Sequence, residues 1–222
     1  AGTLGRLAAS KCNVPIIVHT FHGHVFHSYF GRAKTLIYMN IERHLAKKTD
    51  KIIAISELQK IELVNDHKIG DDSKFEVIPL GFDLAKFQDN MEDKRTSFRE
   101  NYQVKDDEIA VGIIGRLVPI KNHLLFINSI NELKKKTTRK VRAFIIGDGE
   151  EKDSLITYLK ENRLDFTEWD SDARPADITF TSWIRNIDWA NAGLDIITLT
   201  SLNEGTPVSL IEAQASNRAV VT

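Results

Sequence analysis

The 222-residue sequence predicts an α/β fold in which parallel strands alternate with crossover helices. Short runs rich in β-branched residues alternate with longer amphipathic stretches along the whole chain. Several of the short runs, including residues 52–55 and 111–114, are almost continuously apolar, which is typical of strands covered on both faces. We therefore expect parallel sheets with helices packed against them.

Each short run marks an expected strand. In chain order these strands span residues 16–18, 51–55, 75–78, 109–114, 141–146, 178–180, 195–199 and 219–221.

The helices expected between them have recognisable starting signals. Ser56 can cap a helix through its hydroxyl while Gln59 reaches back to the start of that helix, a capping-box pattern. Pro207 suits a first helical position, where its missing N–H has no partner to lose. The other expected helices span residues 3–10, 32–48, 91–102, 122–136 and 151–162, and the one after Pro207 runs to residue 217.

A domain boundary is expected at residues 79–83, Pro-Leu-Gly-Phe-Asp, where proline and glycine interrupt the alternation after a strand and before a charged helix. The chain is long enough for two domains that each bury a core. We predict domains at residues 1–82 and 83–222, both with the same strand–helix rhythm.

Composition narrows the class of protein. One cysteine, Cys12, excludes an internal disulfide and favours a reducing compartment. No apolar run approaches the roughly 20 residues that span a bilayer, and no signal peptide is seen.

The chain starts at Ala1 inside an expected helix, so it resembles an excerpt of a longer protein. A net charge of −1 gives no reason to expect a nucleic-acid partner, and we expect a cytoplasmic location.

The most informative segment is residues 204–212, Glu-Gly-Thr-Pro-Val-Ser-Leu-Ile-Glu, at the carboxyl end of an expected strand. Open α/β sheets bind ligands at that edge, and the free N–H groups at a helix start attract anions. Glu204 and Glu212 can accept hydrogen bonds from hydroxyls on two parts of one ligand, such as a sugar and a ribose. By spacing alone, a capped surface helix with two solvated glutamates is the commoner explanation.

Two further loops follow strands of the same expected sheet. Arg116 and Lys121 come directly after residues 109–114, where a guanidinium fork and an ammonium could clamp a diphosphate. A solvated basic loop is the alternative for either residue alone. The Gly147-Asp148-Gly149 turn follows residues 141–146, but Lys152 stands where a dinucleotide fingerprint needs its third glycine. We therefore exclude NAD binding.

Four histidines, His19, His22, His24 and His27, follow the first expected strand. A metal site is disfavoured because no carboxylate or cysteine lies among them, and the nearest acidic residue is Glu42. A polar catalytic or binding role for a histidine beside Gly23 is the better interpretation.

Taken together, these segments resemble the retaining glycosyltransferases of family 4, which have the GT-B fold. Residues 201–213, Ser-Leu-Asn-Glu-Gly-Thr-Pro-Val-Ser-Leu-Ile-Glu-Ala, carry most of the likeness, joined by the loops at 115–121 and 147–149. Residues 18–23, 53–56 and 77–81 resemble the end of that family's first domain. The resemblance implies two Rossmann-like domains of GT-B type facing each other across a cleft, both incomplete in this chain.

The resemblance also implies roles for individual residues. Arg116 and Lys121 would bind the donor pyrophosphate and stabilise the leaving nucleoside diphosphate. Glu204 would contact the transferred sugar, Glu212 would hold the ribose hydroxyls, and His22 would lie near the reacting sugar. The catalytic set is then His22, Glu204, Arg116 and Lys121, and the remaining donor-binding residues are Gly147, Asp148, Gly149, Trp183, Ile184, Gly205, Thr206 and Pro207.

The implied reaction is transfer of a sugar, with retention, from a nucleoside-diphosphate sugar to a glycan or lipid-linked acceptor in polysaccharide or glycoconjugate biosynthesis. Family tendency favours UDP as the carrier, and no metal or other cofactor is expected. The first strand and glycine-rich loop of the family, which contact the acceptor, do not appear in this sequence. A nucleotide-sugar epimerase and a non-catalytic nucleotide-sugar binding module remain alternatives, whereas a phosphorylase would need a pyridoxal lysine for which no motif is present.

The expected helix at 32–48 admits two interpretations. It is basic and carries apolar Leu36, Met39 and Leu45, so it could rest on an anionic membrane surface. Packing of this apolar side against the domain core is the favoured interpretation.

Overall fold

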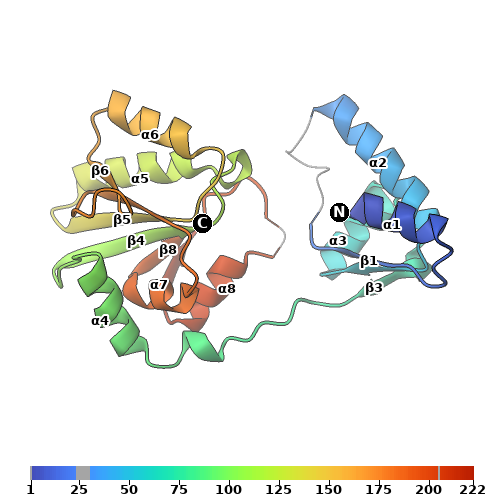
Figure 1. The fold of residues 1–222 in the computed structure, drawn as a ribbon, viewed down its shortest axis with the longest axis horizontal. Coiled ribbons are helices and arrows are strands. Elements are labelled where there is room, and N and C mark those ends of the chain that lie inside the picture. The colour runs from blue at the N-terminus through green and yellow to red at the C-terminus, as the bar shows by residue number, and fades with distance from the viewer. Residues whose placement is uncertain (1, 24–30, 205) are drawn as a thin grey trace. The chain divides into compact units, whose positions relative to one another are not determined.

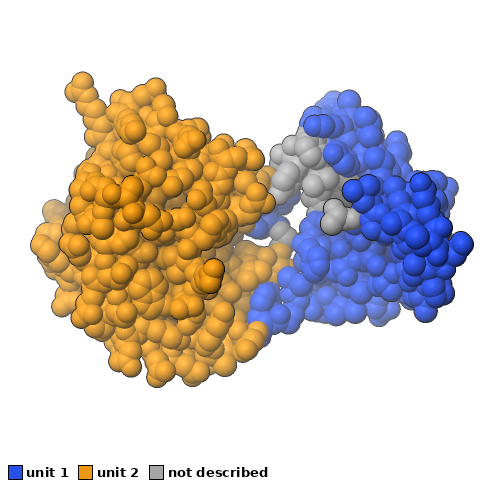
Figure 2. Space-filling model, in the orientation of Figure 1, with its two compact units in different colours: residues 1–82, 203–205 blue, residues 83–202, 206–222 orange. Residues whose placement is uncertain are grey.

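The computed structural model describes residues 2–23, 31–204 and 206–222, and they form two compact units. Unit 1 comprises residues 1–82 with 203–205, and unit 2 comprises residues 83–202 with 206–222 (Figure 2). The short segment 203–205 is grouped with unit 1 although it lies within the second predicted domain. Each unit is an α/β layer structure, as the sequence predicted (Figure 1).

Unit 1 is built on a three-stranded parallel sheet of order β1-β2-β3. Its apolar core contains Phe21, Ile52, Leu63 and Phe75, contributed by the strands and by the helical segment after β2. The elements of this unit are α1 (Gly2–Lys11), β1 (Val18–Phe21), α2 (Arg32–Lys47), β2 (Lys51–Ala54), α3 (Glu57–Ile61), the π-helical η1 (Glu62–Asp66), η2 (Asp72–Lys74) and β3 (Phe75–Val77).

The predicted cap of α3 is present with one change. The backbone N–H of Gln59 donates to Ser56 Oγ at 3.1 Å, as the capping-box pattern requires. The Gln59 side chain reaches back to the N–H of Ile55 at 3.0 Å, one residue earlier than the cap itself. The start of this helix is therefore fixed by its own sequence.

Unit 2 is built on a six-stranded parallel sheet of order β6-β7-β5-β4-β8-β9. Its elements are η3 (Ala85–Phe87), α4 (Met91–Asn101), β4 (Glu108–Ile114), η4 (Pro119–Lys121), α5 (His123–Lys136), β5 (Lys140–Ile146), α6 (Lys152–Glu161), β6 (Phe166–Glu168), β7 (Ile178–Ser182), α7 (Ile187–Gly193), β8 (Ile196–Thr198), α8 (Val208–Ala215) and β9 (Ala219–Val221).

Helices cover both faces of this sheet, which explains the continuously apolar strands (Figure 1). One core cluster joins residues of α5 and α6 to the sheet, including Phe126, Leu155 and Leu159. The other joins residues of α4, α7 and α8, including Phe98 and Leu210. The sheet is thus the middle layer of a three-layer unit.

The strand order of unit 2 reverses between β4 and β8. From β4 the chain moves outward on one side to β5 and then to the edge strand β6, and it comes back to β7 between them. It then crosses to place β8 on the other side of β4. In open α/β sheets a ligand crevice forms at the carboxyl ends of the strands where the order reverses. The topology therefore predicts a ligand site at the loops that follow β4 and β8.

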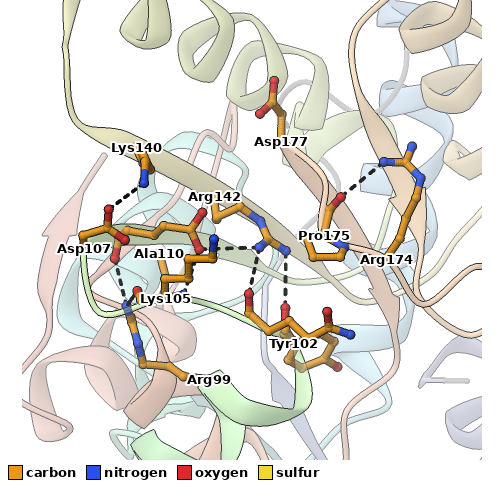
Figure 3. A network of polar contacts seen from close by, with 12 residues as sticks. Arg99, Tyr102, Lys105, Asp107, Ala110, Lys140, Arg142, Arg174, Pro175 and Asp177 are labelled. Atoms are coloured by element: carbon orange, nitrogen blue, oxygen red, sulfur yellow. Dashed lines mark hydrogen bonds and ion pairs between the residues drawn. The ribbon is translucent and has the colours of Figure 1, made fainter.

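The opposite, amino-terminal edge of the sheet is held by a polar network (Figure 3). The buried side chain of Arg142 on β5 donates to the carbonyls of Gln103 and Tyr102 at 3.3 and 3.4 Å. Arg99 on α4 donates to the carbonyls of Lys105 and Glu108 at 2.5 and 2.9 Å. These bonds join the end of α4 to the starts of β4 and β5.

Most predicted strands agree with the structure to within one residue at each end, and β7 runs two residues longer. The first strand was placed wrongly, since β1 spans Val18–Phe21 rather than residues 16–18. Ile16 and Val18 are 69% and 52% exposed, so the apolar run there does not mark a buried strand. β6 and α7 were not predicted, because both are short and their sequences are not strongly periodic.

Two helix predictions also need correction. Pro207 lies at the N-cap of α8 rather than at its first helical position, with φ −77° and ψ 83°. On α2, Leu45 is buried and Met39 packs against the core of unit 1, as the favoured core-packing interpretation required. Leu36 is 53% exposed and does not share that environment. No helix within the described residues is long and apolar enough to span a membrane.

Candidate functional site

Backbone hydrogen bonds bring the loops after β4 and β5 together. The N–H of Gly115 donates to the carbonyl of Ile146 at 3.0 Å, and the N–H of Leu117 donates to the carbonyl of Asp148 at 3.0 Å. The N–H of Glu151 returns to the carbonyl of Leu117 at 3.0 Å. The predicted loops around Arg116 and Asp148 therefore lie side by side at the carboxyl edge of the sheet.

Glycine is required twice in the turn after β5. Gly147 has φ +140°, and a Cβ there would lie 2.0 Å from the carbonyl oxygen of Gly115. A Cβ on Gly149 would lie 2.4 Å from the carbonyl oxygen of Leu117. These glycines let the loops after β4 and β5 approach to backbone contact. This close approach, and not only a tight turn, explains why glycine is needed at both positions.

Asp148 shapes this turn from within. Its Oδ1 accepts from the N–H of Gly149 at 2.7 Å, and its Oδ2 accepts from the hydroxyl of Ser182 at 3.3 Å. The N–H of Gly147 also donates to the carbonyl of Ser182 at 3.0 Å. The end of β7 is thereby joined to the loops that follow β4 and β5. The segments predicted to border the base, the turn after β5 and the residues after β7, therefore lie at the same edge of the sheet.

The residues after β7 differ in exposure. Trp183 is 58% exposed, whereas Ile184 packs against the core that includes α4, α7 and α8. Of these two predicted neighbours of the base, Trp183 therefore presents the larger accessible surface to a ligand.

The loop after β8 is tied to the loop after β4. The hydroxyl of Thr200 lies 3.0 Å from the carbonyl oxygens of Lys121 and Asn122. The N–H of Leu202 donates to the carbonyl of Ile120 at 2.9 Å. These contacts lie across the point where the strand order reverses, so the loop carrying Lys121 is held by β8 as well as by β4.

Arg116 follows Gly115 directly in the loop after β4, and the side chain of Lys121 lies close to the same glycine. A Cβ on Gly115 would meet the Cε and Cδ atoms of Lys121 at 3.7 and 3.8 Å, so the lysine side chain extends across the glycine. Arg116 is exposed, and its guanidinium makes no hydrogen bond or ion pair within the described residues. The two cations that were predicted to clamp a diphosphate therefore belong to one short loop.

The helix α8 begins after the predicted sugar-binding segment. Thr206 and Pro207 are half-buried, and the carbonyl of Pro207 accepts from the N–H of Leu210 at 3.0 Å. Glu204 is half-buried in the segment grouped with unit 1, and Gly205 lies outside the described residues.

Glu212 lies in the second turn of α8 and is half-buried. Its carboxylate accepts no hydrogen bond from the part of the chain that the structure describes. Burial raises the pKa of Glu212, the nearby ammonium of Lys86 opposes that shift, and Asp188 adds to it. Because this half-buried carboxylate has no described hydrogen-bond donor, it is suited to accept hydrogen bonds from a ligand.

The predicted histidine of the cleft belongs to unit 1. His22 follows β1 directly and is exposed. Its neighbour His19 is more buried, and burial, Arg6 and His22 together lower the pKa of His19 to about 4. His24 and His27 lie outside the described residues.

Sequence reasoning missed several residues around the site. Thr200 ties two of its loops together, Lys86 and Asp188 act on Glu212, and His123 is fully buried directly after Lys121 and Asn122. Burial, followed by the charge of Lys121, lowers the pKa of His123 to about 4. The position of His123 next to the predicted clamp was the only sequence signal that could have singled it out.

Comparison with known proteins agrees with this architecture. Residues 108–222 match the family described as glycosyl transferases group 1, and residues 1–86 match glycosyltransferase family 4. A UDP-Gal:alpha-D-GlcNAc-diphosphoundecaprenol alpha-1,3-galactosyltransferase of Escherichia coli is 31% identical over 97% of this chain and 53% of its own length. The O-antigen biosynthesis glycosyltransferase WclY of Escherichia coli is 23% identical over 96% of this chain and 54% of its own length.

Solved structures share the fold. Anabaena Alr3699/HepE, solved in complex with UDP and glucose, has a TM-score of 0.76 at 18% identity and is matched over 98% of this chain and 55% of its own. WaaG, a glycosyltransferase involved in lipopolysaccharide biosynthesis, has a TM-score of 0.73 at 13% identity, over 97% of this chain and 61% of its own. The chain spans about half the length of the curated relatives it matches. From its fold and from the family matches over both units, the chain belongs to the group 1 glycosyltransferases, with the GT-B fold that the sequence predicted.

Proposed function

We propose that this chain carries the donor site of a retaining glycosyltransferase that moves a sugar from a UDP-sugar to a glycan or lipid-linked acceptor. The observation that carries the proposal is the placement of Arg116 and Lys121 on the loop after β4, beside the reversal of strand order. Two relatives support UDP as the carrier: the Escherichia coli galactosyltransferase is named for UDP-Gal, and the Anabaena structure contains UDP and glucose.

The chemistry of sugar transfer explains why two cations belong there. When the bond between the anomeric carbon and the phosphate oxygen breaks, negative charge develops on the leaving diphosphate. Fixed positive groups lower the free energy of that transition state, with Arg116 as a planar fork and Lys121 as a point charge. The acceptor oxygen bonds to the anomeric carbon on the face that the phosphate leaves, and its proton passes to the departing phosphate oxygen. No covalent protein nucleophile takes part.

The other site residues complete the donor site in this proposal. Glu204, with the backbone of residues 205–207, contacts the transferred sugar, and His22 is assigned to the reacting sugar. Glu212 accepts from the ribose hydroxyls, which its half-buried carboxylate with no described hydrogen-bond partner is suited to do. The turn at Gly147 and Gly149, with Trp183, borders the base.

Metal independence is part of the proposal, because the charges of Arg116 and Lys121 would replace a divalent cation. Transfer by the full-length protein should persist in excess EDTA. Loss of transfer that Mg²⁺ or Mn²⁺ restores would show that a metal is required.

Isothermal titration with UDP tests the clamp directly. The double variant Arg116→Ala, Lys121→Ala should weaken UDP binding at least about a hundredfold, because two charge-assisted contacts are removed. Arg139→Ala is the matched control, since Arg139 is an exposed arginine immediately before β5, at the other edge of the same sheet. Unchanged UDP affinity in the double variant would disprove the clamp.

Two alternatives have distinct outcomes. A nucleotide-sugar epimerase would release UDP and an altered free sugar when no acceptor is present. A non-catalytic binding module would bind UDP-sugar, yet in the full-length protein His22→Ala and Glu204→Ala would leave turnover unchanged. The proposal requires both substitutions to lower the rate of sugar transfer to acceptor.

Peripheral contact of unit 1 with an anionic membrane is the last part of the proposal, because such contact would suit a lipid-linked acceptor. It is supported by the exposed apolar side chains of Leu36, Ile37 and Tyr38 on the basic helix α2. Leu36→Asp combined with Ile37→Asp should abolish co-sedimentation with vesicles rich in anionic lipid. Equal sedimentation of the variant and the unsubstituted chain would refute this contact.

A further inference from the structure

A pocket of about 790 Å³ lies in unit 1, between the end of α2 and the segment that runs from η1 to η2. Because α2 leads into β2 and this segment leads into β3, the pocket is at the amino-terminal edge of the parallel sheet. The residues assigned to sugar transfer do not line it. The charged residues of its wall are four cations and one carboxylate, a net charge of +3: Arg43, Lys47, Lys68, Lys74 and Asp71.

Lys74 neutralises the end of α2 at this pocket. The last carbonyls of a helix carry partial negative charge, which would repel an anion. The Nζ of Lys74 donates to three backbone carbonyls at this helix end, at distances of 2.8 to 3.4 Å: Ala46, Lys47 and Thr49. The Lys74 ammonium therefore offsets the negative helix end, and the other cations of the wall remain to attract an anion.

Arg43 is held in place with donors to spare. Its Nε donates to the carbonyl of His67 at 2.9 Å, and its Nη1 donates to Asn40 Oδ1 at 3.1 Å. These two bonds fix the plane of the guanidinium, while Nη2 makes no hydrogen bond to any residue that the structure describes. A fixed guanidinium with spare N–H groups is suited to pair with two oxygens of a phosphate.

Lys47 and Lys68 add two further cations to the wall. Lys47 lies one helical turn after Arg43, on the same side of α2, and Lys68 follows η1. Both lysines are exposed, and neither ammonium makes a hydrogen bond or ion pair within residues 2–23, 31–204 and 206–222. The carboxylate of Asp71 makes no ion pair there either. The three cations around this hollow repel one another, and a bound anion would relieve that repulsion.

We infer that this pocket of unit 1 binds a phosphate group, supplied by a soluble phosphate ester or by the headgroup of an anionic lipid. Arg43 presents its planar fork, and Lys47 and Lys68 add point charges from two different segments. A phosphate monoester offers three acceptor oxygens and a charge of about −2, which matches three cations better than a carboxylate does. The inference does not depend on the donor site, whose assigned residues lie outside this pocket.

An NMR titration of the isotope-labelled chain with inorganic phosphate, at constant ionic strength set with KCl, tests the pocket. The backbone amide signals of residues 67–71 should shift and saturate, whereas those of residues 115–121 report separately on the donor loop. Lys47→Gln combined with Lys68→Gln should weaken phosphate binding at residues 67–71 about tenfold, because each exposed charge contributes about threefold.

Two further variants make the test specific. Lys11→Gln combined with Lys136→Gln removes the same charge from exposed lysines outside the pocket, and it should bind phosphate like the unsubstituted chain. Lys68 has a left-handed backbone, with φ 54°, which glycine adopts without strain. Lys68→Gly should therefore weaken phosphate binding about threefold without lowering the temperature of thermal unfolding.

Co-sedimentation with phosphatidylglycerol vesicles distinguishes the two sources of the phosphate. If a lipid headgroup is the ligand, the Lys47/Lys68 double variant loses vesicle binding, and inorganic phosphate competes with the vesicles. If a soluble ester is the ligand, inorganic phosphate shifts the amide signals of residues 67–71 while vesicle binding is the same in both chains. Either result supports the phosphate pocket.

Three results would overturn the inference. The first is the absence of saturable shifts at residues 67–71. The second is equal phosphate affinity in the Lys47/Lys68 double variant and the Lys11/Lys136 control. The third is loss of vesicle binding without saturable phosphate binding, which would show diffuse attraction between a basic surface and an anionic membrane.

Discussion

The hydroxyl of Thr200 lies 3.0 Å from the carbonyl oxygen of Lys121, and this contact joins the loop after β8 to the loop after β4. The same hydroxyl lies 3.0 Å from the carbonyl of Asn122, so it can donate to either acceptor. Asn122 has a left-handed backbone, with φ 51° and ψ 50°. Thr200 therefore fixes a sharp change of direction between the predicted diphosphate lysine and α5.

Thr200→Val should weaken UDP binding about threefold, because it deletes one neutral hydrogen bond that orders the Lys121 loop while keeping the side-chain shape. Isothermal titration measures this effect. Thr198→Val is the matched control, since Thr198 makes a similar bond to the carbonyl of Gly112 at 3.1 Å within the sheet. Equal losses of affinity in both variants would mean that general destabilisation, rather than loop order, explains the result.

The strand–helix alternation of the sequence predicted most of the fold. Buried strands such as β4 and β5 are readable because both of their faces are apolar, and Ser56 and Gln59 mark a helix start by local hydrogen bonding. β1 was misplaced because Ile16 is apolar, like the residues of a buried strand, but is exposed in the structure. Burial depends on tertiary packing, so a short apolar run alone does not show which of its residues are covered.

The candidate site was predictable only where its residues follow strands. Arg116 and Asp148 were predicted as site residues because they follow strands directly, and Glu212 because it lies about two turns into the helix that follows another strand. Lys86 and Asp188 could not be found in this way, because η3 and α7 pack against α8 only in the folded unit. The glycines of the turn were noticed, but the reason for Gly147, its approach to the Gly115 carbonyl, needed the fold.

Gly147→Ala should lower the free energy of unfolding of unit 2 by more than about 2 kcal/mol, because a left-handed backbone and a direct clash with the Gly115 carbonyl act together. Gly115→Ala is the control: its Cβ would meet only Lys121 at ordinary contact distance. All three tryptophans, Trp169, Trp183 and Trp189, belong to unit 2, so urea unfolding followed by tryptophan fluorescence reports on this unit. Equal stability of the two variants would contradict the proposed close approach of the loops.

Asp195 provides a test of acid stability. Burial alone would raise its pKa, but the N–H of Ala110 and the guanidinium groups of Arg95 and Arg99 outweigh burial and lower it. A carboxyl whose folded pKa is lowered stabilises the fold above its unfolded pKa, and this contribution is lost as the pH falls below about 4. Asp195→Asn should therefore cost about 2 kcal/mol at pH 7, and the difference from the unsubstituted chain should shrink towards pH 3. A difference that stays constant over this range would show that charge is not the cause.

His123 also makes the fold less stable as the pH falls, beginning at a higher pH than Asp195, and its effect can be isolated because it is the only histidine among residues 83–222. Its side chain is fully buried, and neither ring nitrogen has a hydrogen-bond partner among the described residues. Burial and then Lys121 lower its pKa from 6.5 to about 4. Between these two values the unfolded chain binds more protons than the folded one, so stability falls as the pH falls.

The size of this effect follows from the difference between the two pKa values, because each pH unit between them is worth about 1.4 kcal/mol. The free energy of unfolding should therefore fall by about 3 kcal/mol between pH 6.5 and pH 4. His123→Phe replaces a buried ring that lacks partners by an apolar one, so it should leave stability at pH 7 nearly unchanged or slightly higher. Urea unfolding of unit 2 at half-unit pH steps, followed by tryptophan fluorescence, measures both curves. The difference between them should grow steadily below pH 6.5, because the carboxylates titrate alike in both chains. Parallel curves would mean that His123 is protonated in the folded protein and has a polar partner that the described contacts do not include.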